Sequence, residues 1–283
     1  MIQLKFGDYL VCVDPPSGGS VAAFRWRGQD VLRPQTRPGV LESASFPLVP
    51  FCNRITGGCF KFAGRTVSLS PNHPCGADEP AMHGFGWILP WKVEARGPAA
   101  VALALDFPGG AWPWSFRAVQ ELSLDPDGLL MRLTLTNLAD EAMPAGLGFH
   151  PYFPRDRATL YHGLHRAELH QNGKLSYADN AIDWWDSTPV NTRLVDTAYA
   201  GRVGPLEVTW PDRGLGTQVT SSGGLDCTHV YVPRGDEFFC VEPVSHLPNR
   251  TPSQRAAFSM KVLDPGQAWS EWIRLRAHAA PPM

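Results

Sequence analysis

The stretch LMRLTLTN, residues 130–137, alternates apolar with polar side chains. Met or Leu stands at positions 131, 133 and 135, and Arg or Thr stands at positions 132, 134 and 136. Successive side chains of a β-strand point to opposite faces. This spacing therefore predicts a strand with one apolar face and one polar face.

Five more stretches alternate in the same way. They are VALALDF (101–107), THVYVP (228–233), EFFCVE (237–242), AFSMKVL (257–263) and EWIRLR (271–276). The last two are separated by DPGQ (264–267), where Pro and then Gly stand in the positions that a tight turn favours. Gly and Pro number 27 each, which leaves little room for long helices. Many short strands between turn signals predict an all-β fold, a large antiparallel β-sandwich.

One long stretch does not follow this pattern. Residues 176–200 lack a clear period of two, and we expect them to run over the surface, with a helical turn at most. The chain shows no internal repeat, no low-complexity tract and no segment that resembles an interdomain linker. We therefore expect residues 1–283 to form a single domain.

Charge and composition narrow the classes of partner. The 283 residues include 25 Lys plus Arg and 27 Asp plus Glu, a formal net charge of −2. This balance gives no electrostatic reason to expect nucleic acid or an anionic membrane as partner. No apolar run reaches the roughly 18 residues of a membrane span, and the N-terminus does not resemble a signal peptide. We expect a cytoplasmic protein, either a monomer or a homodimer.

The six cysteines, at positions 12, 52, 59, 75, 227 and 240, contain no C-x-x-C pair and fit no zinc or disulfide framework. Free thiols, most of them buried, are the expectation. A metal site built from His83, His150 and His246 lacks any ligand pair at close metal-binding spacing. We therefore predict no metal site.

Five ionisable residues stand beside turns or aromatic residues and are candidates for chemistry: Arg54 in FCNRITGG, His83 in AMHGFGW, His150 in GLGFHPYFPR, Asp226 in GLDCTHVYV and Glu242 in FFCVEPVSH. Each also has a purely structural explanation, such as a surface ion pair, a turn cap, a satisfied core histidine or an exposed strand end. No nucleotide-binding, nucleophile-elbow or metalloprotease motif accompanies them. Taken singly, none of the five decides a function.

The order of the motifs resembles the aldose 1-epimerase (mutarotase) family. The matching pieces are NRITGGCFKFAGR (53–65), HGFGWILPW (83–91), GFHPYF (148–153), LDCTHVY (225–231), VEPVSHLPN (241–249) and LDPGQ (263–267). Together they reach from about residue 45 to about residue 270. The resemblance implies a large antiparallel β-supersandwich, in agreement with the strand pattern.

The resemblance also implies roles. Glu242 corresponds to the general base and His150 to the general acid, while Arg54, His83 and Asp226 correspond to positions that bind sugar hydroxyls. Mutarotation removes the proton of the anomeric hydroxyl and protonates the ring oxygen, so it needs an acid and a base but no metal or redox cofactor. We expect the two groups on opposite sides of C1, with Glu242 ionised and His150 protonated because their charges attract.

Some residues depart from the best-known galactose mutarotases. Phe149 stands before His150 where those proteins tend to have Asn, and Val244 stands where they tend to have Gln. Preference for glucose or galactose is therefore open. Three other functions also remain open: a hexose-6-phosphate mutarotase, a non-catalytic carbohydrate-binding sandwich, and a glycoside hydrolase that uses Asp226 and Glu242 as paired carboxylates.

Overall fold

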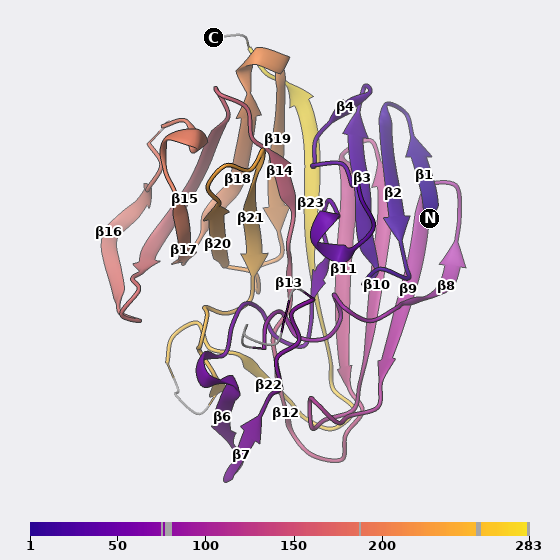
Figure 1. The fold of residues 1–283 in the computed structure, drawn as a ribbon, viewed down its shortest axis with the longest axis vertical. Coiled ribbons are helices and arrows are strands. Elements are labelled where there is room, and N and C mark those ends of the chain that lie inside the picture. Colours follow the sequence, from indigo (N-terminus) through magenta and orange to yellow (C-terminus); the bar gives the residue numbers. More distant parts are fainter. Residues whose placement is uncertain (75, 77–80, 187, 253–255, 282–283) are drawn as a thin grey trace.

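Antiparallel β-strands make up nearly all of the regular structure (Figure 1). The computed structural model describes residues 1–74, 76, 81–186, 188–252 and 256–281. Within those ranges there is no α-helix, and so no helix long and apolar enough to cross a membrane. The short 3₁₀ helices are η1 (Val40–Glu42), η2 (Thr56–Gly58), η3 (Val190–Thr192) and η4 (Pro211–Arg213).

A sheet of fifteen strands is the main layer. Its path is β5 (Pro47–Leu48), β13 (Gly148–Phe149), β21 (Phe238–Val244), β20 (Cys227–Val232), β17 (Val195–Ala200), β15 (Leu160–Leu169), β18 (Val203–Trp210), β19 (Leu215–Ser221), β23 (Ala268–Ala279), β11 (Gly128–Asn137), β10 (Phe116–Asp125), β9 (Ala100–Phe107) and β8 (Lys92–Arg96). Two strands pair beside this path, β14 (Tyr152–Pro154) with β21 and β16 (Leu175–Asp183) with β15.

A second sheet covers one end of the first, next to β10 and β11 (Figure 1). Its strands are β1 (Ile2–Phe6), β2 (Tyr9–Asp14), β3 (Ser20–Trp26) and β4 (Gln29–Asp30). Buried polar bonds join the layers: Gln120 Nε2 donates to the Gly19 carbonyl at 2.6 Å, and Tyr9 Oη donates to the Ala277 carbonyl at 3.3 Å. Two two-stranded sheets complete the fold: the hairpin of β6 (Cys59–Phe62) and β7 (Arg65–Ser68), and the long-range pair of β12 (Met143–Ala145) and β22 (Lys261–Leu263).

The predicted antiparallel β-supersandwich is confirmed. In β11, which contains the stretch 130–137, the apolar residues at 131, 133 and 135 are buried and the polar residues at 132, 134 and 136 are half-exposed. The DPGQ turn is present, with the Gln267 N–H donating to the Asp264 carbonyl at 3.0 Å and Gly266 at a φ of 73°. The described cysteines are free thiols, and Cys75 lies outside the described residues.

Two expectations about strands were wrong. Residues 176–200 hold most of β16 and all of β17 rather than a surface excursion, although the expected helical turn is present as η3. No residue of β16 is fully buried, so no apolar face is needed to set a period of two. The stretch 257–263 forms a strand only over its last three residues, in β22.

Candidate active site

Three ionisable side chains lie in one row across neighbouring strands. Glu242 on β21 is the register partner of His229 on β20. On the other side of β21, Gly148 pairs with Val244 and Tyr152 with Cys240, and the same register places His150 opposite Glu242. Register partners share a face of the sheet, so His150, Glu242 and His229 all face the same way.

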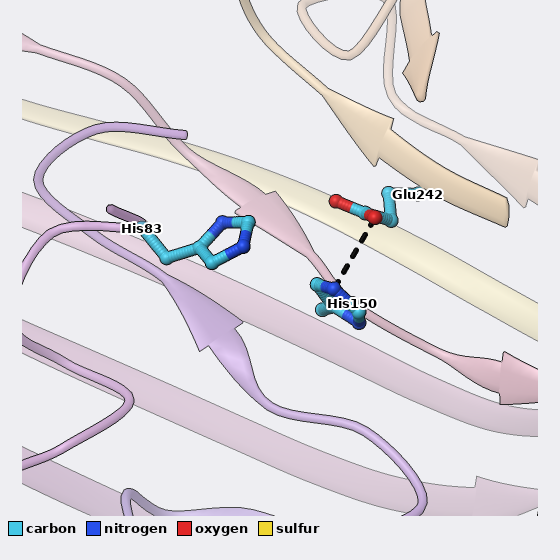
Figure 2. A group of neighbouring side chains, drawn as sticks. All are labelled: His83, His150 and Glu242. Atoms are coloured by element: carbon cyan, nitrogen blue, oxygen red, sulfur yellow. Dashed lines mark ion pairs between the residues drawn. The ribbon is translucent and has the colours of Figure 1, made fainter. Parts of the chain in front are cut away.

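His150 and Glu242 form a buried pair (Figure 2). His150 Nε2 lies 3.2 Å from Glu242 Oε1, and the two residues are only 7% and 2% exposed. His83 approaches from the loop before Trp87, and its ring centroid lies 5.1 Å from that of His150 at an interplanar angle of 87°. These three residues, which are far apart in the sequence, therefore share one site.

Aromatic rings fix the position of the His150 imidazole. Phe46 stacks on it with a centroid distance of 4.5 Å and an interplanar angle of 25°, and Tyr152 lies 4.7 Å away at 34°. The His150 backbone N–H also donates to the Phe46 carbonyl at 3.0 Å. The ring-rich sequence around His150 thus orients the imidazole and excludes water from it.

His83 is held by Asn53 through two backbone contacts. The His83 N–H donates to the Asn53 carbonyl at 3.0 Å, and the Asn53 N–H donates to His83 Nδ1 at 3.2 Å. The backbone φ angles of His83 and Asn53 are positive, 58° and 54°, a conformation that residues other than glycine rarely adopt. Because Nδ1 accepts a hydrogen bond, we assign the ring proton to Nε2, which makes His83 a donor toward the site.

The row opens into a cavity of about 960 Å³. Its lining combines aromatic faces, such as those of Phe46 and Trp87, with polar groups that include Arg54, His83 and His229. A cavity of about 340 Å³ adjoins it and shares Arg54 and His229. Flat apolar faces beside hydrogen-bonding groups suit a small polyhydroxylated ligand.

Asp226 does not lie with the other four predicted residues, so the expectation that all five share one face is corrected. It is not among the described residues that line the cavity. It precedes β20, where alternation assigns it to the side of Thr228, while His229 faces the cavity. Its carbonyl accepts the Arg202 N–H at 2.9 Å, and its Oδ1 lies 3.6 Å from Cys227 Sγ.

The sequence-based expectation missed a histidine–aspartate pair. His229 Nε2 lies 2.8 Å from Asp196 Oδ1, and both residues line the cavity. Asp196 belongs to β17, in the stretch expected to be a surface excursion. The sequence did contain a signal for His229. His229 and Tyr231 are two positions apart in THVYV and so share a face of the strand, and this strand pairs with the one that carries Glu242.

Burial shifts both groups of the His150–Glu242 pair toward their neutral forms. It lowers the pKa of His150 to about 3 and raises the pKa of Glu242 to about 7. Burial thus opposes the charged state that we expect for the active form, an ionised Glu242 beside a protonated His150. Burial therefore favours a neutral His150 beside a Glu242 that holds the pair's proton.

His83, His150 and Glu242 each bring one possible metal-ligand atom within 4.8 Å of the others. A metal-bound histidine needs a free lone pair, but His83 Nδ1 accepts the Asn53 N–H and Nε2 carries the proton. His246, considered above as a ligand, accepts the Cys52 N–H at Nε2 and donates from Nδ1 to the Leu247 carbonyl. The hydrogen bonds therefore favour proton transfer over metal binding.

Comparison with known proteins gives the family. The profile described as Aldose 1-epimerase matches residues 1–276. The chain belongs to the aldose 1-epimerase family. An uncharacterized family relative, YphB of Escherichia coli K12, is 29% identical over 274 residues, which are 92% of each chain.

Solved structures agree with the family fold. A crystal structure of a candidate aldose 1-epimerase from Escherichia coli K12 matches with a TM-score of 0.86 at 26% identity, over 98% of both chains. A galactose mutarotase-like protein from Clostridium acetobutylicum matches with a TM-score of 0.81 at 18% identity, over 98% of this chain and 94% of that one. The second likeness concerns the fold alone.

Proposed function

We propose that this aldose 1-epimerase family member is a mutarotase that interconverts the α and β anomers of a free aldohexose. The observation that carries the proposal is the buried pair of His150 Nε2 and Glu242 Oε1, 3.2 Å apart beside the cavity. The reaction moves a proton off O1 and a proton onto O5. Both oxygens are bonded to C1, so the acid and the base lie close together rather than on opposite sides of C1.

One proton on the pair is enough for the cycle. It first passes from Glu242 to His150. Glu242 then takes the proton of the O1 hydroxyl while His150 protonates O5, and the C1–O5 bond breaks to leave an aldehyde. The C1–C2 bond rotates, O5 attacks the other face of C1, and both protons return. Each acid–base group of this kind typically contributes about 10²–10⁴-fold to the rate.

The other lining residues hold the sugar. The Nε2–H of His83 and the guanidinium of Arg54 donate hydrogen bonds to sugar hydroxyls, in line with the roles that the family resemblance implies. Asp226 has no such role in this proposal, because it does not line the cavity.

A free sugar fits the lining charges better than a sugar phosphate. Arg33 has no carboxylate partner among the described residues, and its guanidinium lies 4.0 Å from the Tyr152 ring and 4.5 Å from the Phe238 ring. The carboxylates of Asp236 and Glu237 line the same cavity next to Phe238, however, and they repel a phosphate. A hydrolase with Asp226 as its second carboxylate is not supported by the position of that residue.

Polarimetry tests the proposal. Fresh α-D-glucose and α-D-galactose are compared with a panel of sugar phosphates. Glu242→Gln and His150→Gln each lower kcat by about 10² or more and leave sugar binding largely intact. Glu237→Gln, at an exposed position of the cavity rim, is the matched control for the first variant. Sugar binding without mutarotation by the wild type would instead favour a carbohydrate-binding protein, and a fully active Glu242→Gln would remove the proposed base.

A further inference from the structure

His229 is a buried histidine that the proposed proton transfers do not use. It flanks Glu242 on the side away from His150, in the row described above. Side chains of register partners in an antiparallel pair have their Cβ atoms roughly 4.5–5.5 Å apart. The imidazole of His229 is therefore a direct neighbour of the Glu242 carboxyl.

Asp196 supplies His229 with a carboxylate partner. Its Oδ1 lies 2.8 Å from His229 Nε2, and its Oδ2 lies 4.0 Å from Arg54 Nη1. The Asp196 side chain is 55% exposed while that of His229 is 9% exposed. Water therefore stabilises the carboxylate, and the carboxylate stabilises a positively charged imidazole in the interior.

Three buried polar atoms in this row have no hydrogen-bond partner in the described part of the chain, and one of them, His150 Nδ1, belongs to the proposed acid. The other two are His229 Nδ1 and Glu242 Oε2. Buried polar atoms without partners are uncommon in folded proteins. A positive His229 on the neighbouring strand acts against the effect of burial on Glu242 and favours release of its proton.

Among the described buried histidines of the site, His229 alone has a raised pKa. The titratable and charged groups around Glu242 and His229 are Cys52, Arg54, His83, His150, Tyr152, Asp196, Tyr231 and Cys240. Burial lowers the pKa of both other histidines and raises the pKa of both thiols and both phenols, so all six are neutral. Burial also acts to lower the pKa of His229, but the Asp196 hydrogen bond and the Glu242 charge together raise it.

We propose that Asp196 and His229 form a positioning pair that keeps a positive charge beside Glu242 and thereby sets the pH at which Glu242 releases its proton. The pair acts through Glu242 and not on the reacting atoms. Its effect on turnover rests on the proposed mutarotase function. Its effect on Glu242 itself does not, and can be measured without substrate.

Asp196→Asn keeps the size of the side chain and removes the carboxylate. The matched control is Glu207→Gln, because Glu207 Oε1 binds His278 Nε2 at the same distance of 2.8 Å and Glu207 is not among the described lining residues. The Glu242 carboxyl is titrated by NMR in protein labelled with ¹³C at its glutamate carboxyls, and Glu242→Gln assigns the signal. The pH profile of kcat/KM is recorded for the same proteins.

In Asp196→Asn two effects oppose each other, because loss of the Asp196 charge acts to lower the pKa of Glu242 and loss of the His229 charge acts to raise it. The His229 effect is the larger, so the titration midpoint of Glu242 rises, by at most about one pH unit, and the alkaline limb of kcat/KM moves by the same amount. His229→Gln shifts both in the same direction, and Glu207→Gln shifts neither. An unchanged Glu242 midpoint in Asp196→Asn, or an equal shift in the control, overturns the proposal. If the wild type does not epimerise sugars, the proposed function fails while the NMR titration still decides this inference.

Discussion

Replacing Glu242 by Gln is expected to stabilise the protein at alkaline pH while it strongly lowers kcat. The carboxyl is 2% exposed, and burial raises its pKa from 4.5 to about 7. The folded state therefore binds the Glu242 proton more tightly than the unfolded state does. The resulting penalty is absent below pH 4.5, grows as the pH rises, and is complete above pH 7. Its full size is about 3 kcal/mol.

The assay is denaturant unfolding of the wild type and Glu242→Gln at pH 4 and pH 8. The variant gains about 3 kcal/mol relative to the wild type between the two pH values, because Gln has no proton to lose. Glu237→Gln, at the exposed rim of the same cavity, shows no such gain. If the difference between Glu242→Gln and the wild type were the same at both pH values, Glu242 would not carry a buried proton and the proposed proton count would fail.

Three further outcomes are expected. The kcat/KM of the wild type falls as pH rises through about 7, because the pair loses its one proton; a profile that stays flat to pH 9 would contradict this. Exhaustive chelation leaves mutarotation unchanged, since His83 donates from Nε2 rather than binding a metal; loss restored by one divalent ion would show otherwise. Gly146→Ala costs about 1–3 kcal/mol in unfolding free energy and weakens sugar binding, because its Cβ lies 2.4 Å from His246 Nε2, the atom that anchors the Cys52 N–H. Gly223→Ala, where the added carbon meets nothing within 4 Å, is the control.

Most of the fold could be predicted from side-chain alternation, because strands with one buried face must alternate. The prediction was correct for β11, which has one buried face, and wrong for β16, which has none. No face of β16 is fully buried, so nothing in its sequence has to repeat every second residue. The local pattern also could not show that residues 257–260 lie outside the strand and that only residues 261–263 form β22.

The site was harder to predict than the fold. The motifs around His83, His150 and Glu242 pointed to residues that do meet in one site, but motif order carries no information on which way a side chain faces. Asp226 and His229 are three positions apart, so strand alternation directs their side chains to opposite faces of the sheet. The protonation state of the His150–Glu242 pair also could not be predicted from the sequence, because the pKa shifts depend on how completely the surrounding rings exclude water.

Within the described part of the chain, only one end of the fifteen-stranded sheet contributes residues to the cavity. None of the described residues of β8, β9, β10, β11 or β23 lines the cavity, although all belong to the same sheet as the site. Side chains at that end serve packing, whereas those at the β13–β17 end also line the proposed site. The exposed turn at Pro126 and Asp127, between β10 and β11, is consequently a place to insert a reporter domain or an immobilisation tag without altering the reaction.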